Sequence, residues 1–283
     1  MTPVVAAAVL LAAFTHAGWN ALAHRIEDKL VGFTLIAGGG VLLGLAMAPF
    51  VALPSAGAWP YLLASAVVHV AYMMLLMRSF KLGDFGQAYP IARGSAPLVV
   101  TVLAAVFAHE VPDGWAASGV ALSCAGLTGV ALWGLRGRRP DWAAIGAALA
   151  TGVAIAVYTV VDGLGVRASG TSLGYIAWLM TLQGVAIPAY ALYRWRGGTL
   201  ARLRPHAAVG FLGAALSVAA YGLVLWAQTR AALAPVAALR ESSIIVGAAI
   251  GAVFFKERFG APRIAAAGLL VVGIGLMLHA GAG

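Results

Sequence analysis

The sequence predicts an all-α integral membrane protein with ten transmembrane helices, arranged as two inverted five-helix repeats around a central cavity. Composition is the first observation, because hydrophobic residues make up 62% of the 283 residues and charged residues only 10%. Ordinary soluble domains reach neither this balance nor a mean hydropathy of +0.95. The second observation is a series of ten apolar stretches, each near the roughly 20 residues that cross about 30 Å of hydrocarbon. The third is a pattern that recurs in the two halves of the chain.

Helix-breaking and charged residues separate the stretches of the first half. The first crossing ends where charged residues begin, at Arg25. Pro54 and Gly57 separate the second crossing from the third, and Pro112 separates the fourth from the fifth. Residues 81–84 interrupt the apolar pattern only weakly between the third and fourth. The crossings predicted in this half are residues 4–24, 30–50, 61–80, 87–109 and 114–135.

The basic run 136–140 follows the fifth crossing and divides the chain into an N-terminal repeat, residues 1–138, and a C-terminal repeat, residues 141–283. Gly197 and Gly198 interrupt the chain after the seventh crossing. Because every connection is short, we expect a single transmembrane domain without a soluble part. The crossings predicted in this half are residues 143–166, 173–193, 207–228, 234–255 and 264–279.

The two halves share a sequence pattern around two arginines. When the first half is shifted by 147 positions, seven of the eighteen residues from Arg93 to Glu110 are identical to those from Arg240 to Glu257. Each repeat holds five crossings, an odd number, so the second repeat must enter the membrane from the opposite side. The halves are therefore predicted to be inverted repeats. Secondary transporters often have this plan, with the substrate site near the midplane between the repeats and alternating access to it.

Basic residues are distributed unevenly along this chain of net charge +9. Of the 18 Lys and Arg residues, 14 belong to the odd-numbered connections and two to the even-numbered ones, and the tails have none. This bias follows the positive-inside rule. It predicts a multi-pass protein of a bacterial-type inner membrane, with both termini extracytoplasmic, rather than a protein that binds nucleic acid. The lone Cys124 excludes an internal disulfide, and no metal site or cofactor is expected.

Polar residues recur on single faces of the predicted helices, as expected for helices that line a cavity. In the first helix His16, Trp19 and Asn20 stand at positions i, i+3 and i+4 and share one face. An Asn and a His inside an apolar helix are costly, which favours a substrate role for this set. A single Ser or Tyr often only bonds a neighbouring helix. The other substrate-site candidates are His69, Tyr72, Tyr89, Tyr158, Asp162, Trp178, Tyr221, Ser242 and Ser243.

Arg93 and Arg240 have two interpretations. A guanidinium offers two parallel N–H groups to a substrate carboxylate or phosphate. Alternatively, each arginine bonds the carbonyls of a broken helix, and Glu241 neutralises part of the charge of Arg240. Pro90 and Pro235 lie one turn or so before the two arginines and favour kinks in both helices. Both arginines are therefore included among the candidates, with the two roles left open.

Residues around the arginines resemble a known family. The segments are residues 86–97 with the sequence GQAYPIARGSAP, residues 234–242 with the sequence APVAALRES, and residues 16–21 with the sequence HAGWNA. Over nearly its whole length the chain is similar to the EamA-type transporters of the drug/metabolite transporter superfamily. Among these it most resembles the YddG-type exporters of aromatic and other neutral amino acids. The resemblance implies export of such small metabolites across the lipid bilayer, through a central cavity built from inner helices of both repeats.

Three other functions are compatible with a polytopic membrane protein: a membrane enzyme, a channel-like facilitator and an exporter of other compounds. A membrane enzyme needs a catalytic cluster, whereas Asp162 and Glu241 are isolated and no His-x-x-x-His motif occurs, so no catalytic residue is assigned. A channel-like facilitator and an exporter of other amphipathic compounds or drugs stay open as alternatives. Small multidrug relatives carry a proton-binding Glu in the first helix, where this chain has no acidic residue. His16 is the titratable group there, and protons are a candidate coupling ion.

Overall fold

The computed structural model describes residues 1–82, 85–134, 141–246 and 261–280. Side chains are described within these ranges except at residues 24, 76–77, 79–82, 85–90, 130–134, 261–263 and 280. Every regular element in this part of the chain is an α-helix or a short 3-10 helix. The predicted all-α class is therefore confirmed for the described residues.

Five long helices form the first half of the chain, and their ends lie within three residues of the predicted ones. They are α1 (Pro3–Arg25), α2 (Lys29–Met47), α3 (Trp59–Leu82), α4 (Phe85–Phe107) and α5 (Gly114–Gly134). The 3-10 turns η1 (Ala48–Phe50) and η2 (Ala56–Ala58) connect α2 to α3. Local capping sets several boundaries: the Asp28 carboxylate accepts the N–H groups of Leu30 and Val31, so α2 starts directly after it.

The second half of the chain contains shorter and more interrupted helices. The helices are α6 (Trp142–Ser169), α7 (Ser172–Gly184), α8 (Ala186–Trp195), α9 (Thr199–Leu203), α10 (Ala207–Gln228), α11 (Leu233–Arg240) and α13 (Ala261–Ala280), and the 3-10 turn η3 (Arg204–His206) precedes α10. Asp141 caps the start of α6, and Gly170 ends it with a φ of 73°, a backbone conformation that glycine adopts without steric cost. The predicted seventh crossing is divided between α7 and α8. Residues 247–260 of the predicted ninth crossing and its connection, Glu257 among them, lie outside the described residues.

The helices have the length and composition of membrane spans. Within the described residues six stretches are long and apolar enough to cross a membrane: Pro3–Ala23, Lys29–Phe50, Ala56–Leu75, Trp142–Ser169, Ser172–Trp195 and Thr199–Gln228. Shorter apolar stretches occur in α4 and α13. Large apolar side chains such as Val67, Val102 and Val271 are exposed, which lipid tolerates and water penalises. The chain is therefore a multi-pass membrane protein.

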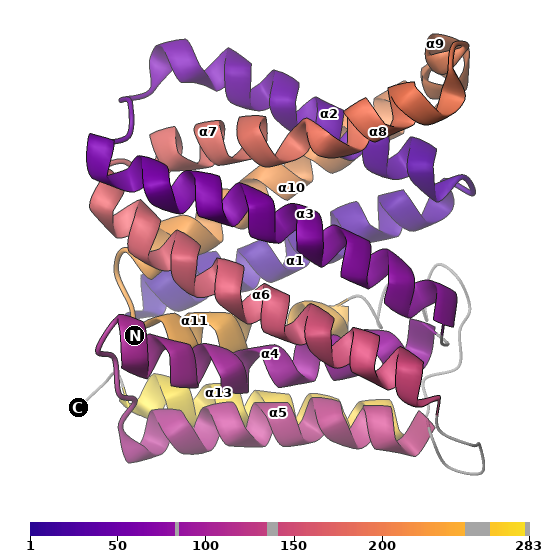
Figure 1. Cartoon of the computed structure of the whole chain (residues 1–283). Helices are drawn as coiled ribbons and strands as arrows, with labels where there is room; N and C mark the ends of the chain where they lie inside the picture. The colour runs from indigo at the N-terminus through magenta and orange to yellow at the C-terminus, as the bar shows by residue number, and fades with distance from the viewer. Residues whose placement is uncertain (83–84, 135–140, 247–260, 281–283) are drawn as a thin grey trace.

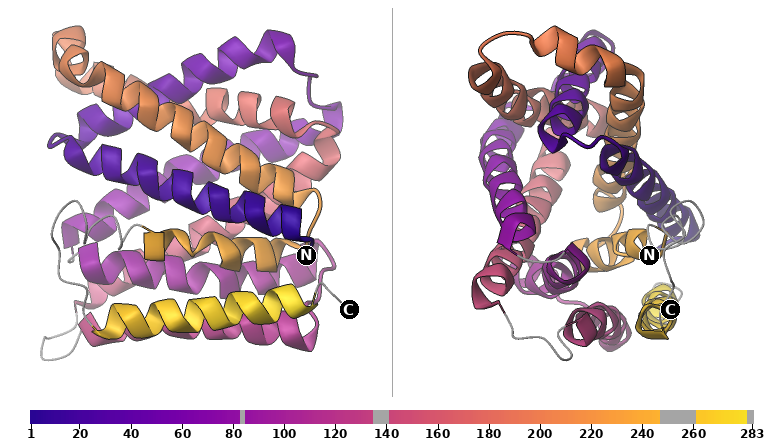
Figure 2. Two further views of the ribbon diagram at one scale, coloured as in Figure 1. Left: turned by 180° about the vertical axis from the view of Figure 1, so that it is seen from behind. Right: turned by 90° about the vertical axis from the view of Figure 1, so that its right-hand side faces the viewer.

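The helices lie side by side across the molecule (Figure 1). α5 and α13 form the layer at one edge, and α2, α7 and α8 lie at the opposite edge. Helices of the two halves pack directly on one another, α3 on α6 and α1 on α10, as the view from behind in Figure 2 shows for the second pair. The two halves of the chain are therefore interlocked rather than separate bundles.

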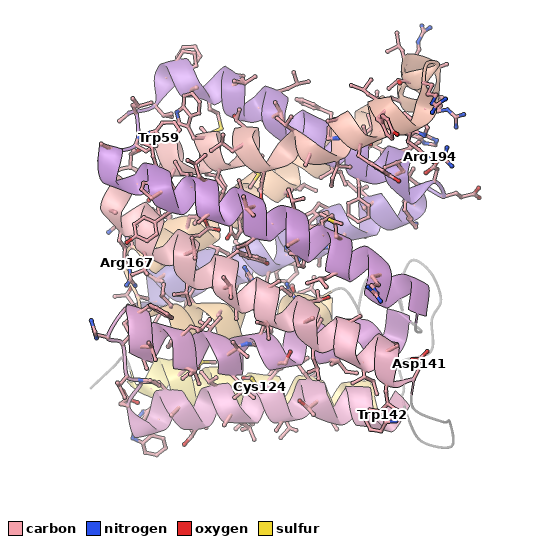
Figure 3. The ribbon with its side chains drawn as sticks, viewed as in Figure 1. Trp59, Cys124, Asp141, Trp142, Arg167 and Arg194 are labelled. Carbon is pink, nitrogen blue, oxygen red and sulfur yellow. The ribbon has the colours of Figure 1, made fainter. Side chains whose placement is uncertain are left out.

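Most of the described helix ends lie at one of two opposite ends of the molecule (Figure 1). Both termini lie at one end (Figures 1 and 2). Figure 3 places Trp59 and Arg167 at that end, and Asp141, Trp142 and Arg194 at the opposite end. The basic residues of the connections after α1 and after α8 are thus remote from the termini, in agreement with the charge pattern. That this basic end faces the cytoplasm stays a prediction.

Two glycines allow α5 and α13 to pack closely. A Cβ at Gly119 would lie 2.5 Å from the carbonyl oxygen of Gly273, and a Cβ at Gly273 would lie 2.6 Å from the carbonyl oxygen of Gly119. No side chain fits at such a distance. Helix pairs in membranes use small residues in this way to bring their backbones together.

Candidate substrate site

Four aromatic side chains from three helices meet in the interior. His69 and Tyr72 lie on α3, Tyr158 on α6 and Tyr221 on α10. The rings of His69 and Tyr158 are stacked, with centroids 4.1 Å apart. Tyr72 meets Tyr158 edge-on at 5.5 Å, and Tyr221 meets His69 edge-on at 5.9 Å. We call these four residues the aromatic cluster; it joins side chains from both halves of the chain, all of them sequence-predicted candidates.

The rings of the aromatic cluster are not completely covered by protein. His69, Tyr72 and Tyr221 are half-buried, so part of the surface of each residue remains accessible. Ring faces and edges of this kind bind apolar and aromatic groups, and each well-oriented ring contact contributes about 0.5–1.5 kcal/mol beyond its buried area.

Asp162 holds one member of the aromatic cluster, Tyr221, through a hydrogen bond. Its carboxylate is fully buried and accepts a hydrogen bond from the Tyr175 hydroxyl at 2.9 Å and another from the Tyr221 hydroxyl. Each carboxylate oxygen thus has a phenol donor, and the ring of Tyr221 is held in place. Both carboxylate oxygens of the sequence candidate Asp162 are therefore bonded to protein groups. Tyr175 was not among the sequence candidates. Its position in an apolar helix was the available signal, because the hydroxyl of a buried tyrosine usually has a hydrogen-bond partner.

The predicted face of α1 is present, but its polar groups bond partly to one another. Trp19 Nε1 donates to His16 Nδ1 at 3.2 Å, and Asn20 Nδ2 donates to the His16 carbonyl at 2.8 Å. Because an indole N–H only donates, the neutral His16 ring carries its proton on Nε2. All three residues are half-buried. Within the described residues, His16 Nε2 and Asn20 Oδ1 have no hydrogen-bond partner, so these two atoms remain free for a ligand.

Arg93 is an internally paired charge. Its Nε lies 2.8 Å from Glu241 Oε2, and its Nη2 donates to Ser243 Oγ at 2.9 Å. The Nε–Oε2 contact is an ion pair without hydrogen-bond alignment. Arg93 and Glu241 are 4% and 1% exposed, so the pair is shielded from water. It connects α4 to the chain that follows α11.

Arg240 differs from its sequence counterpart. It is the last residue of α11 and is 4% exposed, yet its guanidinium makes no hydrogen bond or ion pair within the described part of the chain. α11 ends here with tight backbone bonds, from the Glu241 N–H to the Ala238 carbonyl at 3.1 Å and from the Ser242 N–H to the Leu239 carbonyl at 3.1 Å. The helix therefore stops in the interior, five residues after Pro235. α4, in contrast, is continuous through Pro90 and Pro97, so the kink expected there does not break it.

The remaining sequence candidates are Trp178, Ser242, Ser243 and Tyr89. Trp178 meets Trp59 edge-on at 5.2 Å, and no ring contact joins it to the aromatic cluster in the described residues. Ser243 accepts from Arg93, and the hydroxyl of Ser242 is buried without a partner among the described atoms. The side chain of Tyr89 lies outside the described residues. No group of three His, Cys, Asp or Glu side chains is arranged to hold a metal among the described residues.

A second charged group lies at the end of the molecule that carries the termini. Arg167 Nη1 is 2.6 Å from Glu110 Oε1, and Glu110 Oε2 accepts the Leu233 N–H at 2.7 Å. Arg167 also donates to the carbonyls of Gln228 at 2.7 Å and Ala231 at 2.9 Å. The pair thus joins the ends of α4, α6 and α10 to the start of α11. From the sequence, Glu110 belongs to the repeat pattern around Arg93, and its pairing with Arg167 was not predicted.

Comparison with known proteins agrees with this architecture. Residues 4–132 match the EamA-like transporter family. The matched segment, rather less than half of the chain, begins in α1 and ends in α5. The match supports a small-molecule transporter of the drug/metabolite transporter superfamily, which is a class of membrane transporters and not of enzymes.

Other comparisons concern the fold. A solved structure, described only as the crystal structure of a protein, matches with a TM-score of 0.69 and 18% sequence identity, over 96% of this chain and 94% of the other. At this identity the likeness shows a shared fold and nothing more. No curated protein matches the chain.

Proposed function

We propose that the protein is a secondary transporter that exports neutral amino acids, aromatic ones included, by alternating access to a central cavity. The aromatic cluster of His69, Tyr72, Tyr158 and Tyr221 carries this proposal, because it presents ring surfaces to the interior at the junction of α3, α6 and α10. Ligand sites are mostly apolar surfaces with a few placed polar groups. A small, partly apolar molecule with one or two polar ends suits this description.

The packing of the helices supports the inverted-repeat part of the proposal. Exchanging the two halves pairs α1 with α6 and α3 with α10. Under this exchange the contact of α3 with α6 becomes the contact of α10 with α1, and both contacts are extensive. α5 and α13, a third equivalent pair, pack on each other. Such an arrangement suits a carrier in which one half rocks against the other around a fixed site.

Polar groups near the aromatic cluster limit the substrate class. Arg93 is occupied by Glu241 and Ser243, and Asp162 is occupied by two tyrosines. No cluster of free basic side chains lies among the described interior residues that could hold a diphosphate or triphosphate. Nucleotide sugars and sugar phosphates are therefore disfavoured, whereas a zwitterion with an apolar side chain needs only single polar contacts.

Counterflow in reconstituted vesicles tests this function. Vesicles loaded with unlabelled phenylalanine should accumulate labelled phenylalanine transiently, and Trp, Leu, Met and Thr should compete. Saturation and trans-stimulation are expected of a carrier, and their absence with rapid equilibration would indicate the channel-like facilitator. Movement of sugar phosphates or amphipathic drugs without any amino-acid flux would overturn the substrate class.

A matched pair of variants links transport to the aromatic cluster. Tyr158→Ala removes the ring that stacks on His69, so counterflow of phenylalanine should fall. Tyr190→Ala serves as the control, because Tyr190 lies on α8 and is 54% exposed. Equal transport by the two variants, at equal amounts in the vesicles, would contradict the assignment of the site.

A further inference from the structure

We propose that Arg240 binds the carboxylate of the transported amino acid, whereas Arg93 serves the structure of the protein. This inference rests on the proposed function. It assigns different roles to two arginines that occupy equivalent positions in the sequence repeat. The structure separates them by their partners: Arg93 has a carboxylate and a hydroxyl, and Arg240 has neither within the described residues.

The environment of Arg240 favours the binding of an anion from outside the chain. A guanidinium that is 4% exposed has lost nearly all of its water, and such a charge is costly unless a counter-ion or acceptors replace that water. Its Nε is fully buried without an acceptor among the described atoms. The interior acids are already engaged, Glu241 with Arg93 and Asp162 with Tyr175 and Tyr221. Within the described residues Arg240 has no ion pair of its own: its neighbour Glu241 interacts with it electrostatically but is in direct contact with Arg93.

The hydroxyl of Tyr158 is a second observation that points to a ligand near Arg240. Tyr158, Tyr221, Glu241 and Arg93 all lie close enough to Arg240 to act on its charge, so these polar groups share one region. The Tyr221 hydroxyl donates to Asp162, but the Tyr158 hydroxyl has no hydrogen-bond partner among the described residues, although the residue is only 6% exposed. Two donors without acceptors, a guanidinium and a phenol, thus share the region in which the ring of Tyr158 contributes to the aromatic cluster.

A carboxylate next to an apolar group satisfies these features together. Arg240 can bind a carboxylate through two parallel N–H groups, and the Tyr158 hydroxyl can donate a third hydrogen bond. The rings of the aromatic cluster then contact the apolar side chain of the same molecule. A phosphomonoester dianion fits less well, because the second interior arginine is held by Glu241.

Substrates that differ only in the carboxylate test the assignment. Wild-type protein should take phenylalanine in preference to phenylalaninamide, which lacks the negative charge. Arg240→Gln should raise the KM for phenylalanine about tenfold or more, the scale expected for loss of a charge-assisted pair, and should leave the uptake of phenylalaninamide nearly unchanged. Retained amide uptake also shows that this variant is folded. Arg202→Gln, on the exposed helix α9, is the control and should leave both substrates unaffected.

The outcomes separate the two proposals. Wild-type vesicles that move neither amino acids nor their amides would overturn the proposed function, and the role of Arg240 with it. Phenylalanine transport with an unchanged KM and unchanged discrimination in Arg240→Gln would overturn the role of Arg240 alone. If Arg240→Gln loses both substrates while its thermal unfolding matches wild type, the arginine acts on the transport cycle and not on the carboxylate, which also contradicts the inference.

Discussion

Arg167 and Glu110 form an ion pair of 2.6 Å that ties together helix ends from both halves of the chain. Each residue also bonds the backbone: Glu110 accepts the N–H of Leu233 at the start of α11, and Arg167 donates to the carbonyls of Gln228, the last residue of α10, and Ala231. Side-chain exposures of 30% and 21% make the ion pair itself a modest contribution. Bonds from charged groups to backbone are stronger, about 1.5–3 kcal/mol each.

Removal of this pair should destabilise the protein in a coupled way. Glu110→Ala and Arg167→Ala should each cost roughly 1–3 kcal/mol, because backbone groups lose their charged partners. The double variant should cost less than the sum of the two, since the second substitution has no ion pair left to break. Thermal unfolding in detergent, followed by tryptophan fluorescence, measures all three. Arg230→Ala, an exposed arginine of the same end that stacks on Trp226, is the control. Strict additivity would show that the pair is not coupled.

Glu241 should be more important for stability than a surface acid. Glu241→Gln leaves the guanidinium of Arg93 buried and without its counter-ion, and breaking a buried pair in this way costs about 3–5 kcal/mol. Replacing both residues, as in Arg93→Met with Glu241→Leu, should recover much of the loss because no buried charge remains. The melting temperatures of the single and double variants in detergent measure both effects. The proposal fails if Glu241→Gln unfolds at the same temperature as Glu27→Gln, a change at an exposed position.

The close approach of α5 and α13 predicts sensitivity to a single methyl group. Gly273→Ala would place a Cβ 2.6 Å from the Gly119 carbonyl oxygen, and overpacking of this kind costs about 1–3 kcal/mol. Gly268→Ala on the same helix meets nothing within 4 Å and is the matched control. We expect a lower melting temperature for the first variant and an unchanged or higher one for the second. Equal melting temperatures would mean that the helices separate without cost.

Membrane orientation can be checked with two single cysteines in a Cys124→Ala background. Ala56→Cys lies in η2, at the end of the molecule that carries the termini, and Ala201→Cys lies in α9, at the basic end; both positions are exposed. If the basic end is cytoplasmic, a membrane-impermeant maleimide added to intact cells should label residue 56 and not residue 201. The reverse labelling pattern would invert the topology, and the packing of the helices would be unaffected.

Much of the helical plan follows from the sequence because its causes are local. Length, apolar composition and flanking Pro, Gly or charge decide where a membrane helix starts and stops, and eight of the helices begin and end within three residues of their predicted limits. The shared face of His16, Trp19 and Asn20 is likewise a consequence of helical spacing. The distribution of basic residues between the two ends also needs no tertiary information.

The partners of the interior charges required the tertiary structure. Arg93 and Ser243 are 150 residues apart in the chain, and Tyr221 and Asp162 are 59 apart, so no local rule could pair them. The sequence repeat makes Arg93 and Arg240 equivalent; packing gives Arg93 a carboxylate in direct contact and leaves Arg240 without an ion pair or hydrogen bond in the described residues. A buried polar group is defined by what lies within about 3 Å of it, and that depends on how distant helices meet. Most helix limits could therefore be predicted from the sequence, whereas the contacts of each interior charge depend on packing.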